Sequence, residues 1–200
     1  STLIEKFSHY GLDENATKWL KSFFTDRRQK VTWQNSESSM TSLHNISVVQ
    51  GSSIGPGAFN TYVNDIQDAS NFTIIQFADD GQFLLSNKNL DSLIINANNE
   101  LKKILDYFES NKLLVSKAKS NYMLIPPKPR QKLPETIVKS GDEIIPRVSE
   151  TKFLGVSYNS TSNSKSGFNL GLILLYITTE MFSAVGFKFL NSSTSKFKFL

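Results

Sequence analysis

Two neighbouring carboxylates, Asp79 and Asp80, are the residues of this sequence whose type and spacing best suit chemistry. They follow the apolar segment 72–77, so we expect a strand that runs into a hairpin turn through Asp80 and Gly81. Carboxylate oxygens at an accessible strand end are ligands that Mg²⁺ prefers. Asp and Gly are also typical of an ordinary solvated turn. Residue type alone therefore leaves a metal site and a plain turn open.

The adjacency of the two carboxylates limits what they can bind. Neighbouring side chains of a strand point to opposite faces of the sheet, so Asp79 and Asp80 cannot both hold the same pair of ions. A two-metal site spans about 3.5–4 Å between its ions and clamps the attacking and leaving oxygens of a displacement. Such a site needs at least one further carboxylate, which we expect on an adjacent strand.

The polar loop at residues 50–57 is a second candidate site, through Gln50, Gly51 and Ser52. Glycine lets the backbone approach a ligand closely, and the Gln and Ser side chains form hydrogen bonds. No Gly-Lys-Ser/Thr sequence follows, which excludes a P-loop. A plain connection from a strand to a helix, with Pro56 in the first helical turn, explains the loop equally well.

Hydrophobic periodicity predicts the elements that must position these residues. Residues 90–108 carry one apolar stripe at helical spacing, which should pack against a sheet. Asp13 suits the N-cap of another helix, and residues 58–66 predict a third. The expected strands are 31–34, 46–49, 72–77, 82–85, 122–125 and 152–158, with a small hairpin at 137–145. We expect an α/β (α+β) fold, in which helices cover one face of an antiparallel sheet that has residues 74–85 at its centre.

Length and composition predict one organised domain followed by a divergent tail. The chain has 200 residues, enough for a single core, and begins at Ser1, so we expect a processed chain or a fragment. Composition changes near residue 159, and residues 159–200 form a Ser/Asn-rich and apolar tail. The apolar part of this tail, 170–190, is long enough for a membrane anchor. We do not favour a span, because Glu180 lies within it and a central charge costs about 2.5–3.5 kcal/mol.

Cysteine usage and charge narrow the class of protein. The sequence has no cysteine, which excludes disulfides and thiolate metal sites. The N-terminal residues lack the pattern of a secretory signal, so we expect an intracellular location, nucleus or cytoplasm. The 22 basic and 18 acidic residues give a net charge of +4, which permits binding to nucleic acid without requiring it.

The order of several short motifs resembles a reverse transcriptase, the RNA-directed DNA polymerase of mobile elements. The resemblance covers about residues 1–158, as a partial palm domain, and is greatest to the jockey-like class of non-LTR retrotransposons. The motifs are, in order, Tyr10-Gly11-Leu12, Arg27-Arg28-Gln29-Lys30-Val31, Gln50-Gly51-Ser52, Gly55-Pro56, Phe77-Ala78-Asp79-Asp80, Asn111-Lys112-Leu113, Lys119-Ser120 and Phe153-Leu154-Gly155-Val156.

The resemblance implies catalytic roles for three residues. Asp79 and Asp80 match the metal-binding aspartates of the palm hairpin, and two Mg²⁺ ions are the implied cofactor. Lys119 matches a lysine whose charge could steady or protonate the leaving pyrophosphate. A solvated surface lysine explains Lys119 equally well.

The resemblance also implies substrate contacts and partners. Phe77 matches a residue close to the primer end, and Gln50, Gly51 and Ser52 match the motif that lines the template–nucleotide pocket. The implied partners are an RNA template, a DNA primer and deoxynucleotides. The implied reaction is attack of the primer 3′ hydroxyl on the α-phosphorus of a deoxynucleotide.

One expected element of the family is missing from this sequence. The family's first catalytic aspartate lies in a strand just before the helix that leads to Tyr10-Gly11-Leu12. That helix, 3–10, is already the beginning here, and the nearest aspartate, Asp13, lies after it. We therefore expect an incomplete palm that cannot build a two-metal site alone.

A non-catalytic remnant that binds nucleic acid is the main alternative function. Its affinity should fall steeply as salt rises. The candidate contacts are Arg27, Arg28, Lys30, Lys117, Lys119, Lys128 and Arg130.

Overall fold

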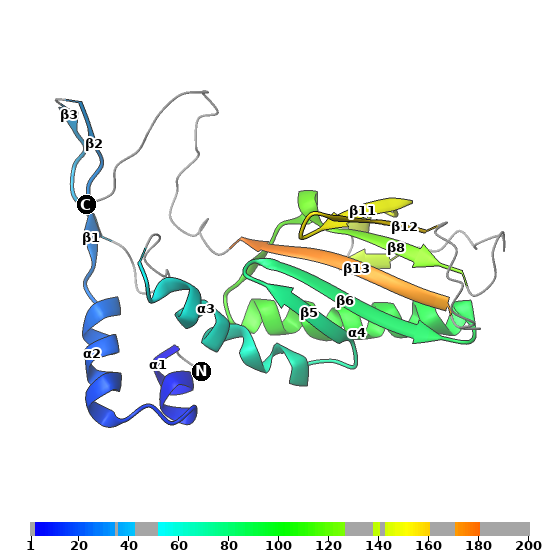
Figure 1. Cartoon of the computed structure of the whole chain (residues 1–200), viewed down its shortest axis with the longest axis horizontal. Helices are drawn as coiled ribbons and strands as arrows, with labels where there is room; N and C mark the ends of the chain where they lie inside the picture. Colours follow the sequence, from blue (N-terminus) through cyan, green and yellow to red (C-terminus); the bar gives the residue numbers. More distant parts are fainter. Residues whose placement is uncertain are drawn as a thin grey trace. The chain divides into compact units, whose positions relative to one another are not determined.

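The computed structural model describes residues 3–34, 36–42, 52–126, 138–140, 143–160 and 171–180. The chain divides into two compact units, residues 1–64 with 181–200, and residues 65–180. Figure 1 traces the elements of both units along the sequence.

The first unit is built on three helices, α1 (Leu3–His9), α2 (Glu14–Phe24) and α3 (Gly55–Val63). Phe7, Leu20 and Ala58, one from each helix, form its buried cluster. The predicted N-cap is confirmed, because the Asp13 carboxylate accepts a hydrogen bond of 2.9 Å from the Ala16 N–H. Two short antiparallel strand pairs follow α2. β1 (Arg28–Gln29) pairs with β4 (Thr41–Ser42), and β2 (Thr32–Trp33) pairs with β3 (Ser36–Glu37).

The helix predicted at 58–66 begins earlier and ends earlier than expected. It starts at Gly55, with Pro56 in its first turn, and ends at Val63. A short 3₁₀ helix, η1 (Asn64–Asp68), continues the chain. Proline suits the first turn because its missing N–H would have no helical partner there.

The second unit contains a five-stranded antiparallel sheet, as the sequence predicted. Its strands run in the order β5, β6, β13, β7, and β8 also pairs with β13. The strands are β5 (Thr73–Phe77), β6 (Asp80–Asn87), β7 (Leu114–Val115), β8 (Asn121–Ile125) and β13 (Gly171–Glu180).

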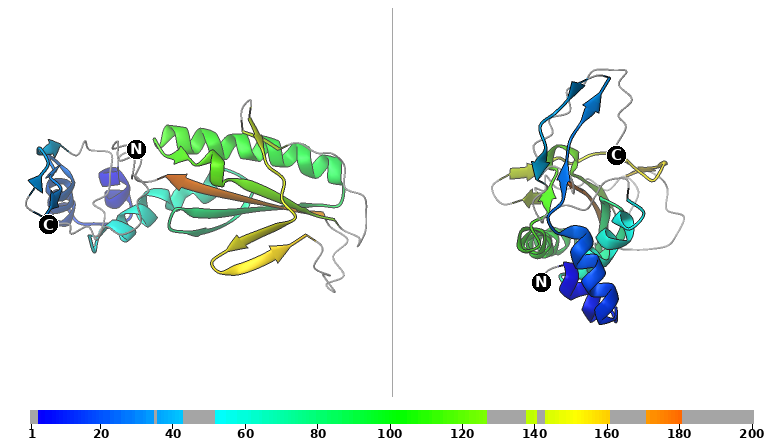
Figure 2. Two further views of the ribbon diagram at one scale, coloured as in Figure 1. Left: turned by 90° about the horizontal axis from the view of Figure 1, so that it is seen from above. Right: turned by 90° about the vertical axis from the view of Figure 1, so that its left-hand side faces the viewer.

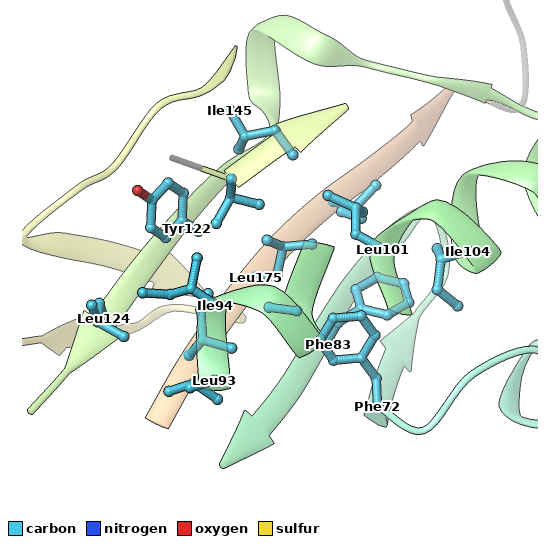
Figure 3. Packing of buried hydrophobic residues seen from close by; sticks show 14 of the residues in the cluster. Phe72, Phe83, Leu93, Ile94, Leu101, Ile104, Tyr122, Leu124, Ile145 and Leu175 are labelled. Atoms are coloured by element: carbon cyan, nitrogen blue, oxygen red, sulfur yellow. The ribbon is translucent and has the colours of Figure 1, made fainter. Parts of the chain in front are cut away.

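Helix α4 (Leu90–Ser110) covers one face of this sheet. Its predicted apolar stripe is confirmed, since Leu93, Ala97, Leu101 and Ile104 are fully buried. In Figure 3 the residues of this stripe lie together with Phe83 of β6 and side chains of β8 and β13. Burial of the stripe against strands stabilises both elements together.

Two small hairpins complete the second unit. β9 (Val138–Ser140) and β10 (Glu143–Ile145) form the hairpin predicted at 137–145 and contribute to the α4 core. The strand predicted at 152–158 is instead a hairpin of β11 (Glu150–Phe153) and β12 (Val156–Asn159). The chain reverses at Leu154 and Gly155, which both have positive φ. Figure 2 shows this hairpin and α4 on opposite faces of the sheet.

The prediction that residues 74–85 lie at the centre of the sheet is confirmed for β6 and wrong for β5. β6 pairs with a strand on each side, whereas β5 is an edge strand. The strand beside β6 is β13, which the sequence did not place in the sheet. Consecutive β13 residues, 173–175, are buried, as expected for a strand covered on both faces. The composition change near residue 159 therefore does not end the regular structure. The strand predicted at 46–49 lies outside the described residues.

The apolar stretch that suggested a membrane anchor contributes β13 to the sheet. Within the described ranges, no helix has the length and apolar character needed to cross a membrane.

Candidate active site

The two acidic residues lie at the tip of the β5–β6 hairpin. Phe77 pairs with Asp80, and the two residues between them, Ala78 and Asp79, form the turn. Ala78 has a φ of 51°, and tight hairpin turns of two residues need positive φ at their first central position. The predicted turn through Asp80 and Gly81 is therefore wrong, because Ala78 adopts the left-handed conformation that the sequence suggested for glycine.

The central strand β13 meets the acidic tip directly. The carbonyl of Asp79 accepts a hydrogen bond of 2.8 Å from the Thr179 N–H, and the Thr179 hydroxyl lies 3.3 Å from the same oxygen. Asp80 stands opposite Thr178 in the sheet register. The Thr178 hydroxyl donates to the Asp80 carboxylate at 3.0 Å. One carboxylate oxygen of Asp80 therefore already accepts a hydrogen bond from β13.

Tyr176 adds a phenol to the same region. Burial raises the pKa of Tyr176, hydrogen bonding with Thr178 lowers it, and the carboxylates of Asp80 and Asp79 raise it further. The net shift is upward, so the phenol remains protonated at neutral pH. The hydroxyls that β13 brings to the acidic tip are therefore neutral.

Two amide side chains flank Tyr176 on its neighbouring strands. Gln82 of β6 and Asn121 of β8 both stand opposite Tyr176 in register. Gln82 Nε2 and Asn121 Oδ1 are buried and have no hydrogen-bond partner among the residues that the structure describes. The face of the sheet next to the acidic tip therefore carries a row of polar side chains, 82, 176 and 121.

The side chains at this tip do not supply the ligands that a pair of metal ions needs. Across the residues that the structure describes, no group of three or more His, Cys, Asp or Glu side chains is placed to hold an ion. Two carboxylates are adjacent in the chain, and one of them accepts from Thr178. The third carboxylate expected on an adjacent strand is not among the described side chains of β13.

The family model described as reverse transcriptase (RNA-dependent DNA polymerase) matches residues 1–158. The chain belongs to the reverse transcriptase family. Neither the search of curated proteins nor the search of solved structures found a match. Reverse transcriptases use divalent metal ions and act on nucleic-acid templates and primers with nucleotide substrates.

In this reverse transcriptase chain, the segment that carries Lys119 meets β13 on the edge opposite β6. The Ser116 N–H donates to the Thr178 carbonyl at 2.8 Å, and the Lys119 N–H donates to the Ser116 carbonyl at 3.1 Å. Lys119 ends the short 3₁₀ helix η2 (Lys117–Lys119), and its side chain is exposed. The fold thus brings the Lys119 segment and the acidic hairpin to the two sides of Thr178.

The remaining predicted contacts are distributed between the two units. Phe77 ends β5 with 61% of its surface exposed, so its ring is accessible beside the acidic turn. Gln50 and Gly51 lie outside the described residues. Ser52 belongs to the first unit, where its hydroxyl accepts a hydrogen bond of 3.0 Å from the Gly55 N–H at the start of α3. The substrate contacts expected of these residues stay predictions.

Sequence reasoning missed the residues of β13 that touch the acidic pair, Tyr176, Thr178 and Thr179. Threonine and tyrosine are common strand residues and carry no signal of their own. The available signal was the short apolar run that begins at residue 170. This run has the length of a buried strand, and a strand adjacent to the acidic hairpin was expected.

Proposed function

We propose that the chain derives from the RNA-directed DNA polymerase of a jockey-like non-LTR retrotransposon. Residues 1–158 are a partial palm domain, and residues 159–200 diverge in sequence from the family although residues 171–180 complete the sheet. The family match and the order of the motifs from Tyr10-Gly11-Leu12 to Phe153-Leu154-Gly155-Val156 support this proposal. The absence of cysteine from the sequence is consistent with an intracellular location in the nucleus or cytoplasm.

The activity proposed for the longer parent enzyme is templated nucleotidyl transfer by a two-metal mechanism. A bond forms between the primer 3′ oxygen and the α-phosphorus of a deoxynucleotide, and the bond to pyrophosphate breaks. Asp79 and Asp80 are the proposed metal-binding residues, with Lys119 near the leaving group. Phe77 is proposed to lie at the primer end, and residues 50–52 at the template–nucleotide pocket.

We propose that residues 1–200 alone do not catalyse this reaction. The observation that carries this proposal is the contact of the acidic pair with β13. The described β13 side chains at this place are hydroxyls, and Thr178 donates to Asp80. A hydroxyl in place of a carboxylate removes the negative charge that a second divalent ion requires.

Primer extension tests this proposal. The intact chain is incubated with a primed RNA template, deoxynucleotides and Mg²⁺, beside the variants Asp79→Ala and Asp106→Ala. Asp106 is an exposed aspartate of α4 and serves as the matched control. We expect the same background incorporation from all three proteins. Robust incorporation by the wild type and Asp106→Ala that disappears in Asp79→Ala would overturn the proposal.

A non-catalytic remnant that binds nucleic acid is the second candidate function. The observation that favours it is the concentration of basic residues in one segment, 18–30. This segment has five Lys or Arg residues and one Asp. Affinity for RNA or DNA should then fall steeply between about 50 and 200 mM salt. Binding that is absent at low salt, or unaffected by salt, would exclude it.

A further inference from the structure

Helix α2 and a residue beyond its C-terminus carry a ladder of two aromatic rings and a guanidinium. Trp19 and Phe23 are four residues apart and lie on one face of α2. Arg27 lies three residues beyond the end of the helix, and its side chain folds back so that Nη1 donates a hydrogen bond of 3.4 Å to the Phe23 carbonyl. The rings of Trp19 and Phe23 stack with centroids 5.8 Å apart and planes 21° apart. The guanidinium carbon of Arg27 lies 4.8 Å from the centroid of the Phe23 ring.

The two rings of this ladder are not part of the core of the first unit. That core consists of Phe7, Leu20 and Ala58, with Phe24 packed against it. Trp19 has 57% of its surface exposed, although tryptophan gains more than almost any residue from burial. The ladder therefore leaves a flat, polarisable surface open to solvent in the first unit.

The charge of the chain is concentrated around the ladder. Residues 18–30 contain five basic residues and one acidic residue, a net charge of +4. The whole chain has 22 basic and 18 acidic residues, also +4, so the remainder has 17 of each and no net charge. Lys18 pairs with Glu14 and Lys30 with Glu37, each at 2.7 Å. In the described part of the chain, the structure records no carboxylate partner for Lys21, Arg27 or Arg28.

We propose that Trp19, Phe23 and Arg27 form a stacking platform for single-stranded nucleic acid. Unpaired bases stack on aromatic rings and on arginine planes whatever their sequence, and nearby cations bind the phosphates. Arg28, which follows Arg27 directly, supplies such a cation. A duplex can offer the platform only its terminal base pairs, since its other bases are already stacked on one another. This inference is independent of the proposed polymerase activity, because the platform needs neither the acidic hairpin nor any metal ion. It rests on the second candidate function, binding of nucleic acid, and specifies its site and the class of nucleic acid.

Fluorescence of Trp19 provides the test in the intact chain. The sequence has two tryptophans, so a Trp33→Phe background makes Trp19 the sole reporter. The probes are oligo(dT), oligo(U) and a blunt DNA duplex of equal charge. We expect saturable quenching by both single strands and at least about fivefold weaker binding of the duplex.

Variants separate stacking from charge. In the wild-type background, read by fluorescence anisotropy of labelled oligo(dT), Trp19→Ala should weaken binding by about 5- to 150-fold at every salt concentration. Trp19→Phe keeps a ring and should lose much less. Arg28→Ala should reduce the salt slope by about one unit, since it removes a phosphate contact. Ile95→Ala, another exposed apolar side chain, is the matched control and should bind as the wild type does.

Three results would overturn the proposal. The first is that neither single strand quenches Trp19 fluorescence at low salt. The second is that the duplex binds with the same affinity as the single strands. The third is that Trp19→Ala binds oligo(dT) with unchanged affinity while its circular dichroism spectrum matches that of the wild type. In any of these cases the ladder serves a protein contact or local packing. All readouts are binding measurements, so their failure is independent of whether the chain extends a primer.

Discussion

Gly81 lies directly after the acidic pair, and its missing side chain makes room for a core ring. A Cβ atom at residue 81 would lie 2.8 Å from Cε2 and 3.2 Å from Cζ of Phe83. Phe83 is only 1% exposed and stacks edge-to-face against Phe72 at 5.9 Å. The ring therefore has no free space into which it can move. Glycine is required here by packing beneath the site and not by the turn itself.

Gly81→Ala should lower the free energy of unfolding by about 1–3 kcal/mol, the usual cost of overpacking a core. Urea denaturation followed by circular dichroism measures this change. Ser86→Ala in the same strand is the control, because Ser86 is exposed and its replacement should change stability by less than about 0.5 kcal/mol. Equal stability of Gly81→Ala and the wild type would contradict the packing argument.

At the residue scale, the sequence identified the acidic pair but misplaced its turn. Residue type alone left a plain turn open, and Asp79 and Asp80 were singled out by their place in the order of motifs that resembles a reverse transcriptase. The position of the turn was not predicted, since Ala78 takes a positive φ that alanine rarely adopts. Local sequence preference pointed to Gly81, but the turn lies at Ala78 and Asp79, and Gly81 is the second residue of β6.

At the scale of elements, α4 is the best-predicted part of the chain and also anchors the start of β5. Its stripe has a 3.6-residue period over several turns, which is a strong signal. Glu100 lies on this helix and accepts hydrogen bonds from the Asn71 N–H at 2.8 Å and from Asn71 Nδ2 at 3.1 Å. Lys103 donates to the same carboxylate at 2.7 Å. Glu100 thereby holds the turn before β5 against the helix.

The pH dependence of stability tests this link. Burial by itself raises the pKa of Glu100, but hydrogen bonds from Lys103 and Asn71 lower it, and the net pKa lies below the ordinary value of 4.5. A depressed pKa contributes stability above the ordinary value, and this contribution is lost as pH falls through the folded-state pKa. The stability advantage of the wild type over Glu100→Gln should therefore be full near neutral pH and shrink in acid.

Urea denaturation of both proteins at a series of pH values between neutral and strongly acidic measures the difference. Asp106→Asn replaces an exposed acid of the same helix and serves as the control at the same pH values. An advantage of the wild type that is constant or grows as pH falls would contradict the assignment.

At the scale of the whole molecule, the second unit depends on a strand from outside the family-matched region. β13 pairs with β6 over eight residues and with β8 over five. Without it, both strands would expose unpaired backbone groups and the α4 core would lose Ile173, Leu175 and Ile177. β13 lies some ninety residues from β6 in the sequence, and local periodicity carries no information on pairing over that distance. For this reason the change in composition near residue 159 predicted the end of the domain, although a further strand of the sheet follows.

Truncation after residue 160 should therefore abolish the cooperative unfolding of the second unit. The comparison is with a chain truncated after Glu180, which retains β13. We expect the longer chain to keep a sigmoidal urea transition and the shorter chain to lose it and bind a hydrophobic dye. Cooperative unfolding of the shorter chain with wild-type stability would show that β13 is dispensable.

The central claim is that the acidic pair lacks the carboxylate it needs because β13 faces it with hydroxyls. The most direct measurement is the effect of Mn²⁺ on the melting temperature of the wild type, Thr178→Asp, Thr178→Val and Asp79→Ala. A carboxylate at residue 178 would stand beside Asp80 and be repelled until a cation binds. We predict that Mn²⁺ raises the melting temperature of Thr178→Asp by at least about 3 °C and leaves the others unchanged. A rise of that size in the wild type that is lost in Asp79→Ala would contradict the account.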